Sequence, residues 1–187
     1  MDLNDSDDTM LRRLPIRRCT EQDMPEMLQI INASAVAYRG VIPADRWHEP
    51  YMSIEELQAE FKARVRFTGY VLADALVGVM GVQEVHNVRL IRHAYILPEQ
   101  QGHGVGSKLL EQLHGQDGRP MLIGTWAAAS WAIRFYERHG FGLVPHETIA
   151  PLLRAYWNVP ERQVETSVVL SSPILSHGDA SKLIAAI

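Results

Sequence analysis

The sequence predicts an α/β fold with a mixed sheet in one domain. Residues 69–75 and 76–85 alternate, are rich in β-branched side chains and meet at a very short Asp74-Ala75 connection, as in an antiparallel hairpin. Residues 88–97 have the pattern of a further strand, followed by a glycine-rich turn, an amphipathic helix and a strand over 121–126. Because a helical crossover joins parallel strands, we expect one parallel pair in an otherwise mostly antiparallel sheet.

Composition and charge narrow the class of protein. The chain has 187 residues, of which 47% are hydrophobic, enough for one domain with a core. No apolar run approaches the roughly 20 residues of a membrane span, and the acidic N-terminus does not resemble a signal peptide. Lys and Arg number 18 against 22 Asp and Glu, so no positive excess favours nucleic acid. We expect a cytoplasmic protein that binds neither membrane nor nucleic acid.

The cysteine and the histidines give no sign of a metal or a disulfide. Cys19 is the single cysteine, and the eight histidines lack metal-ligand spacing, so no structural metal is expected. With no chemistry around it, Cys19 is expected to pack as a small hydrophobe rather than to act as a nucleophile.

The N-terminal part is expected to start with a disordered tail over residues 1–14, which are acidic and contain few apolar side chains. The folded domain is expected over 15–170. It begins with a strand over 16–19 and a helix that Thr20 caps, with Asp23 in the place of the capping-box Glu. The apolar stripe of this helix comprises Met24, Met27, Leu28, Ile31 and Ala35.

Bulky side chains fill the connection to a second helix, expected over 53–64. Tyr38, Trp47 and Tyr51 are too apolar for an ordinary solvated loop. They either line a pocket for a substrate or pack the helices onto the sheet.

The C-terminal part is expected to hold one more helix, around Trp131, which ends at Gly140 in a left-handed cap. A final strand follows over 165–170. Residues 171–187 are expected to form an appended C-terminal tail that packs on a partner.

The turn after residues 88–97 has the chemistry of a phosphate site. Gly102, Gly104 and Gly106 remove three Cβ atoms within five residues, so the backbone can present a row of N–H groups to an anion. The helix that follows has Val105, Leu109, Leu110 and Leu113 on one face, and its N-terminus adds unpaired amides and a positive dipole end.

The spacing distinguishes three kinds of phosphate loop. A nucleotide P-loop requires Gly-Lys-Ser/Thr, whereas the order here is Gly106-Ser107-Lys108. A dinucleotide fingerprint requires a third glycine where Ser107 stands. The pattern Gln/Arg-x-x-Gly-x-Gly/Ala is satisfied by Gln101, Gly104 and Gly106. It resembles the acetyl-CoA loop of the GNAT N-acetyltransferases.

The resemblance extends over about residues 16–170. Residues 131–141 are similar to the later helix of that family, in which an alanine precedes an aromatic pair and the helix closes in Gly-Phe. The family's asparagine three residues before that alanine is Ala129 here, which removes a polar contact to pantetheine or leaves it to Ser130. The resemblance implies a GNAT-like fold: a central, mostly antiparallel twisted sheet with one parallel, splayed strand pair, flanked by helices.

The resemblance also implies where acetyl-CoA binds. Backbone groups around Tyr95, Ile96 and Leu97 are expected to pair with the pantetheine arm, and an N–H near residues 94–96 to face the thioester oxygen. The remaining cofactor contacts are expected from Gln101, Gly102, His103, Gly104, Val105, Gly106 and Ser107. The connection that holds Tyr38, Trp47 and Tyr51 would overhang the acceptor.

Tyr136 is the expected general acid, because a phenol with a pKa of about 10 is protonated at neutral pH and can donate to the leaving thiolate. The alternative is that it only packs its helix. For the base, which must deprotonate an ammonium acceptor, the candidates are His93, Glu84 and also His86. Strand alternation could equally turn His93 into the core.

The sequence thus predicts direct transfer of an acetyl group from acetyl-CoA to a small-molecule or peptide amine, without a metal. The family resemblance makes a homodimer possible. Two other classes remain: a non-catalytic acyl-CoA sensor, which Ala129 leaves open, and a dinucleotide-dependent oxidoreductase.

Overall fold

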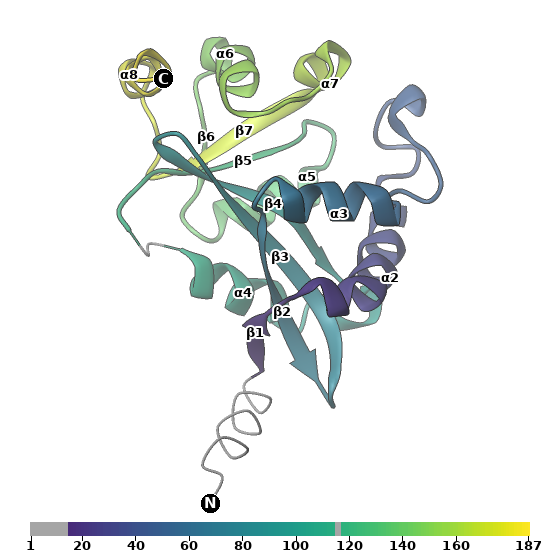
Figure 1. Cartoon of the computed structure of the whole chain (residues 1–187). Helices are drawn as coiled ribbons and strands as arrows, with labels where there is room; N and C mark the ends of the chain where they lie inside the picture. Colours follow the sequence, from purple (N-terminus) through teal and green to yellow (C-terminus); the bar gives the residue numbers. More distant parts are fainter. Residues whose placement is uncertain (1–14, 115–116) are drawn as a thin grey trace, which may run out of the picture. The chain divides into compact units, whose positions relative to one another are not determined.

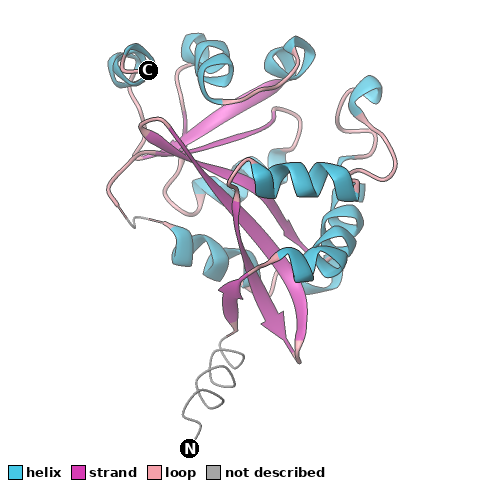
Figure 2. Cartoon of the chain, viewed as in Figure 1, coloured by secondary structure: helices cyan, strands magenta, loops and turns pink. Residues whose placement is uncertain are grey.

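The computed structural model describes residues 15–114 and 117–187, so the expected tail over 1–14 lies outside the described residues. Within this part, seven strands form one sheet in the order β1-β2-β3-β4-β5-β7-β6, and helices flank it (Figures 1 and 2). The strands are β1 (Ile16–Arg18), β2 (Arg66–Leu72), β3 (Ala75–Val85), β4 (Val88–Ile96), β5 (Met121–Trp126), β6 (Gly142–Leu143) and β7 (Ser167–Ser172). The predicted fold class is confirmed.

The helices are α2 (Met24–Ala35), α3 (Ile54–Lys62), α4 (Val105–Leu113), α5 (Ser130–Glu137), α6 (His146–Tyr156), α7 (Glu161–Thr166) and α8 (His177–Ala185). The described residues fall into two compact units. The first takes those within Met1–Val36, Glu49–Gly81 and His93–Leu113, and the second those within Ala37–His48, Val82–Arg92 and His114–Ile187.

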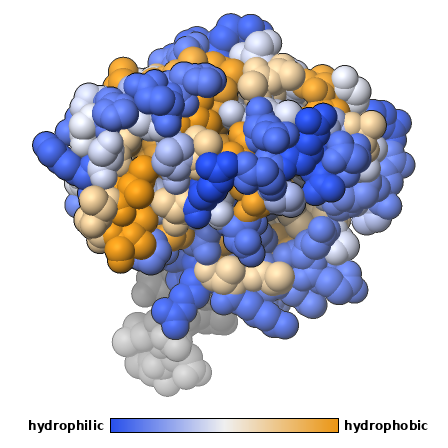
Figure 3. All heavy atoms as spheres, turned by 90° about the horizontal axis from the view of Figure 1, so that it is seen from above, coloured by the Kyte–Doolittle hydropathy of each residue, from blue (hydrophilic) through white to orange (hydrophobic). Residues whose placement is uncertain are grey.

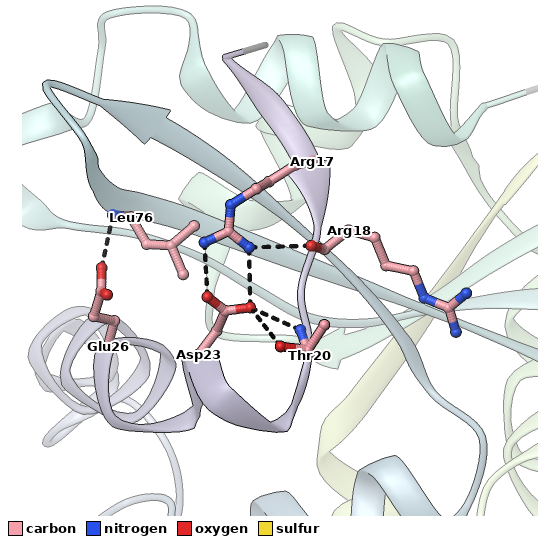
Figure 4. A network of polar contacts seen from close by, with 6 residues as sticks. All are labelled: Arg17, Arg18, Thr20, Asp23, Glu26 and Leu76. Carbon is pink, nitrogen blue, oxygen red and sulfur yellow. Dashed lines mark hydrogen bonds and ion pairs between the residues drawn. The ribbon is translucent and has the colours of Figure 1, made fainter. Parts of the chain in front are cut away.

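In the first unit, a network of polar contacts joins β1, α2 and β3 (Figure 4). Two Arg17 nitrogens donate to the two Asp23 carboxylate oxygens at 2.7 and 3.0 Å, and the Thr20 backbone N–H donates to Asp23 at 2.7 Å. The predicted capping box at Thr20 and Asp23 is confirmed. Glu26, in the first turn of α2, accepts from the backbone N–H of Leu76 at 2.9 Å and so ties the helix to the start of β3.

The core of this unit lies between α2, α3 and the sheet. It includes the buried residues Met24, Met27, Ile31 and Ala35 of the predicted stripe, whereas Leu28 is half-buried. Cys19 is buried at 3% exposure among the same apolar residues, as expected.

The β2–β3 hairpin is confirmed, but its turn is one residue earlier than expected. Ala73 and Asp74 both have positive φ, at 48° and 64°. Left-handed conformation at both central residues is the type I′ turn that suits the right-handed twist of paired strands. Strands β2 and β3 can therefore pair directly on either side of this two-residue turn.

In the second unit, β5 is parallel to β4 in the register Arg89↔Met121, Leu90↔Leu122 and Ile91↔Ile123, as expected. Helix α5 ends as predicted: Gly140 has a φ of 81°, and the Phe141 N–H donates to the Tyr136 carbonyl at 3.1 Å, as in a Schellman motif.

The C-terminal region differs from the expectation. Residues 171–187, expected as an appended tail, complete β7 and form α8, whose Ala180 is fully buried in the core of the second unit. The Tyr156 hydroxyl oxygen of α6 lies 3.0 Å from the Leu183 carbonyl oxygen of α8. The Asn87 amide donates to that carbonyl, at 3.2 Å. Helices α6 and α7 were not predicted.

The face drawn in Figure 3 is mostly hydrophilic, with separate apolar patches. Large exposed apolar residues do occur in the described chain, the most exposed being Ile174 at 64%. Its side chain covers Gly142 of the edge strand β6, where an added Cβ would lie 2.7 Å from Ile174 Cδ1.

Candidate functional site

The predicted phosphate turn leads into α4. Gly102 and Gly104 have φ values of 79° and 80°, which L side chains rarely adopt. An added Cβ would meet no atom within 4 Å at either position, so backbone conformation rather than crowding requires glycine there. Gly106, which was expected to share this role, lies inside α4. The unusual backbone is therefore confined to the turn.

Several backbone N–H groups lie together at the start of α4. The Lys108 N–H donates to the Gly104 carbonyl at 3.1 Å, the first bond of the helix ladder. The amides of Val105, Gly106 and Ser107 precede that bond and point out of the helix start, where the helix dipole is positive. Because the turn before them is exposed, an anion can reach these amides.

The same turn is tied to the end of β4. The Ile96 carbonyl accepts from Ser34 Oγ at 2.6 Å and from Gln101 Nε2 at 3.1 Å. One residue later, the Leu97 N–H donates to the Val77 carbonyl of β3 at 2.9 Å. Gln101, predicted as a cofactor contact, holds the turn to the strand in the structure.

These bonds define which amides of β4 face away from β3. Successive residues of a strand direct their N–H groups to opposite sides. Since the Leu97 N–H points to β3, the N–H groups of Ile96 and Ala94 point away from it. Of the residues expected to pair with pantetheine, Leu97 already uses its N–H within the sheet, whereas Ile96 presents its N–H outward.

Gly78 of β3 also positions this region, and sequence reasoning missed it. An added Cβ would lie 2.6 Å from Ile96 Cδ1 and 3.0 Å from Val105 Cγ1. Glycine here allows the first turn of α4 to pack closely on the sheet. The sequence signal for it is a glycine in the middle of a strand pattern, which often marks a site where another part of the chain packs closely on the strand.

In the first unit, Tyr51 and Tyr95 lie side by side. Their rings are edge to face, with centroids 6.3 Å apart, and both are partly buried against the core of that unit. The structure therefore brings one predicted acceptor residue against one predicted cofactor residue.

In the second unit, Tyr38 and Trp47 each have an aromatic or cationic neighbour. The Tyr38 ring lies 5.3 Å from that of Trp131 on α5, which is 38% exposed. The Arg39 guanidinium lies 5.4 Å from the centre of the Trp47 ring. These contacts are compatible with either of the two expected roles, packing or substrate binding.

Tyr136 lies on α5 in an apolar environment. Only 4% of the residue is exposed, and its ring lies 5.0 Å from that of Phe135 and 5.5 Å from that of Phe141. Burial raises the pKa of the Tyr136 phenol well above its usual value, and the nearby Tyr38 raises it further. The phenol is thus protonated, as a proton donor must be.

Ala129 stands directly before α5, which begins at Ser130. It is fully buried, and its carbonyl accepts from the Ala132 N–H at 3.0 Å and from the Ile133 N–H at 3.2 Å. The residue thus starts the helix with its backbone and brings no polar side chain to it.

Of the three predicted bases, His86 lies in the turn between β3 and β4, and the other two are paired. His93 Nε2 lies 3.2 Å from Glu60 Oε2 of α3, and both side chains are mostly buried. Glu84 Oε2 lies 3.1 Å from an Arg119 nitrogen, and Arg119 also pairs with Asp117. Glu84 is the more accessible, with 40% of its side chain exposed.

Within residues 15–114 and 117–187, no group of His, Cys, Asp and Glu side chains is arranged to hold a metal ion. Over the same residues, no helix combines the length and apolar character of a membrane span.

Comparison with known proteins agrees with this geometry. The acetyltransferase (GNAT) domain family matches residues 66–142, which run from β2 to the start of β6 and include the glycine-rich turn. No curated protein sequence matches the chain.

Solved structures share the fold. PaiA N-acetyltransferase from Thermoplasma acidophilum, in complex with coenzyme A, is 18% identical with a TM-score of 0.62, over 83% of this chain and 96% of that one. Ribosomal-protein-alanine N-acetyltransferase from Brucella melitensis is 19% identical with a TM-score of 0.57, over 87% of this chain and 100% of that one.

A third similar structure is N-acetylglutamate synthase from Neisseria gonorrhoeae, complexed with coenzyme A and N-acetyl-glutamate. It is 18% identical with a TM-score of 0.56, over 83% of this chain and 34% of that one. Residues 66–142 therefore match the acetyltransferase (GNAT) domain family, and the chain shares its fold with these solved N-acetyltransferases.

Proposed function

We propose that this protein transfers an acetyl group from acetyl-CoA directly to an amine. The observation that carries the proposal is the bond from Gln101 to the Ile96 carbonyl, which joins an anion-binding helix start to the outward-facing edge of β4. In acetyl-CoA the pantetheine arm joins the diphosphate to the thioester, so its binding requires the helix start and the edge of β4 to be held at a fixed separation. A free phosphate, or a nucleotide without this arm, would not require it.

The amides of residues 102–107 would bind the diphosphate, with His103 exposed beside them. The outward N–H groups of Ala94 and Ile96 would pair with the pantetheine arm and face the thioester oxygen. An aimed amide of this kind stabilises the negative charge that grows on that oxygen during attack.

The proposed chemistry needs no covalent enzyme intermediate. The amine nitrogen forms a bond to the thioester carbonyl carbon, the carbon–sulfur bond breaks, and the electron pair leaves with the CoA sulfur. Tyr136 then protonates the thiolate and is reprotonated from solvent. The proton lost by the ammonium acceptor passes to Glu84 or to water.

The acceptor is proposed to be a small-molecule or peptide amine bound by Tyr38, Trp47 and Tyr51. Similar structures bear the names of a ribosomal-protein-alanine N-acetyltransferase and an N-acetylglutamate synthase, so this fold serves both peptide and amino-acid amines. The net charge of −4 weakly favours a cationic acceptor.

The test has a binding arm and a turnover arm. Thermal unfolding with acetyl-CoA, NADH and ATP should show a raised midpoint with acetyl-CoA alone, since a ligand at a hundred times its Kd adds about 2.7 kcal/mol of stability. Turnover is followed as free thiol released with amino acids, aminoglycosides, polyamines and peptides. Burial raises the pKa of Cys19 to about 12, so the protein's own thiol should not react with the thiol reagent.

A second candidate is a sensor that binds acyl-CoA without turnover. The low exposure of Tyr136, at 4%, favours the sensor. Catalysis would require this buried phenol to contact the sulfur of CoA. Stabilisation by acetyl-CoA with no amine-dependent thiol release would establish the sensor. Stabilisation by NADH instead would contradict both functions.

A further inference from the structure

His93 adopts a left-handed backbone conformation in the middle of β4, with a φ of 52°. Among the described residues, the other non-glycine residues with positive φ are Arg64, Ala73, Asp74 and His86, and all four lie in turns. A left-handed L residue inside a strand is unfavourable and persists only where its surroundings hold it.

The side chain of His93 is held between α3 and β2. The Nε2 atom lies 3.2 Å from Glu60 Oε2, at ion-pair distance although not in hydrogen-bond alignment. The ring lies 5.9 Å from that of Phe67, which is itself 1% exposed and packed against Phe61. Only 15% of the His93 side chain is exposed, so it is directed into packed protein rather than toward solvent.

The residues after His93 are those proposed to meet the thioester. The parallel register with β5 covers Arg89–Ile91, before His93. After it, the Leu97 N–H bonds to β3 and the Ile96 carbonyl accepts from Ser34 and Gln101. A left-handed residue in a strand is the mark of a bulge, which bends the strand and re-aims the peptides that follow.

We propose that His93 is a positioning residue rather than the base: its side chain, seated between Glu60 and Phe67, fixes the bulge that aims the N–H groups of Ala94 and Ile96. This inference rests on the proposed acetyl transfer. It predicts that His93 and Glu60 act as one unit, although only His93 belongs to β4.

The test compares His93→Ala, Glu60→Gln and the double variant. We expect kcat to fall about tenfold to a hundredfold in each single variant, since small misplacements of a reacting group have effects of that order. The Kd for acetyl-CoA should change less than about threefold, because the diphosphate turn is untouched. The kcat of the double variant should be no lower than that of His93→Ala, because the effects of two residues that act through the same contact are not additive. The shape of the pH profile should not change.

Glu55→Gln is the matched control, because Glu55 is an exposed carboxylate on the same helix. It should leave kcat and Kd unchanged. His93→Asn is a second variant, since Asn tolerates the left-handed region and should recover part of the activity lost in His93→Ala. Loss of the acid limb of the pH profile in both His93 variants, with normal turnover in Glu60→Gln, would identify His93 as the base and overturn the proposal.

A second readout does not depend on turnover. Backbone amide resonances of the ligand-free protein should shift at Ala94, Tyr95 and Ile96 in His93→Ala and Glu60→Gln, but not in Glu55→Gln. Unchanged resonances would refute the positioning role even if the enzyme is active. If the wild-type protein releases no thiol with any amine, acetyl transfer fails while the resonances still decide whether His93 sets the bulge.

Discussion

The Gln101 side-chain amide donates to the Ile96 carbonyl at 3.1 Å and so connects the glycine-rich turn to the end of β4. Ser34 donates to the same oxygen at 2.6 Å, so the carbonyl is held from α2 as well. The proposed diphosphate and thioester sites are therefore linked through one peptide group.

Replacing Gln101 by Ala should weaken acetyl-CoA binding without unfolding the protein. An exposed neutral hydrogen bond contributes about 0.5 to 1.5 kcal/mol, which corresponds to a Kd about two- to tenfold higher. Isothermal titration calorimetry with acetyl-CoA measures this. Gln58→Ala, at an exposed glutamine on α3, is the control and should leave Kd unchanged. An unchanged Kd in Gln101→Ala would mean that the turn keeps its place without this bond.

Replacing Gly104 by Ala should reduce affinity through backbone strain. At a φ of 80° an L residue is unfavourable by about 1 to 2 kcal/mol, although no atom lies near the new Cβ. If binding must restore the strained turn, Kd for acetyl-CoA rises about 5- to 30-fold. Gly118→Ala has a matching φ of 75° and the same open surroundings, so it should lose similar stability but bind normally.

Replacing Tyr136 by Phe should lower kcat about tenfold to a thousandfold, as expected for one positioned acid, and leave Kd for acetyl-CoA nearly unchanged. Since burial raises the pKa of Tyr136, its ionisation should not produce a basic limb below about pH 10. Steady-state kinetics from mildly acid to alkaline pH measures both.

The control for Tyr136 is Tyr156→Phe. The Tyr156 hydroxyl donates to Asn87 at 2.7 Å and lies in α6, so its removal should lower stability but not kcat. Equal activity of Tyr136→Phe and the wild type would leave Tyr136 as a packing residue.

Replacing Asp23 by Asn should destabilise the protein in a pH-dependent way. Hydrogen bonds from Arg17 hold the pKa of the Asp23 carboxyl below its usual value. A carboxyl with a lowered folded-state pKa stabilises the fold above its unfolded pKa of about 3.9, and that stability is lost as pH falls through the folded pKa.

Urea unfolding should therefore show wild type more stable than Asp23→Asn by about 1 to 2 kcal/mol near neutral pH, the scale of a charged hydrogen bond. The difference should shrink as pH falls below about 4 and be lost once the pH is below the folded-state pKa of Asp23. Glu21→Gln, at an exposed carboxylate in the same turn, should show no such difference. If the difference in unfolding free energy between wild type and Asp23→Asn persisted in acid, the effect would come from the shape of the side chain rather than from its charge.

Much of the local structure followed from the sequence. The capping box at Thr20 and Asp23, the left-handed glycines at 102, 104 and 140, and strand β5 at residues 121–126 all depend on spacings of a few residues. Helices α6 and α7 were not predicted, although α6 buries Leu152 completely.

The sequence by itself determined the glycine-rich turn and the family to which it is similar, because both depend on glycines and polar residues at fixed short spacing. Only the tertiary structure decided that Gln101 bonds to Ile96, that His93 faces Glu60, and that Glu84 pairs with Arg119. The partners in the last two pairs are more than thirty residues apart. Pairing over such separations is set by how strands and helices pack, which the local pattern around one residue does not contain.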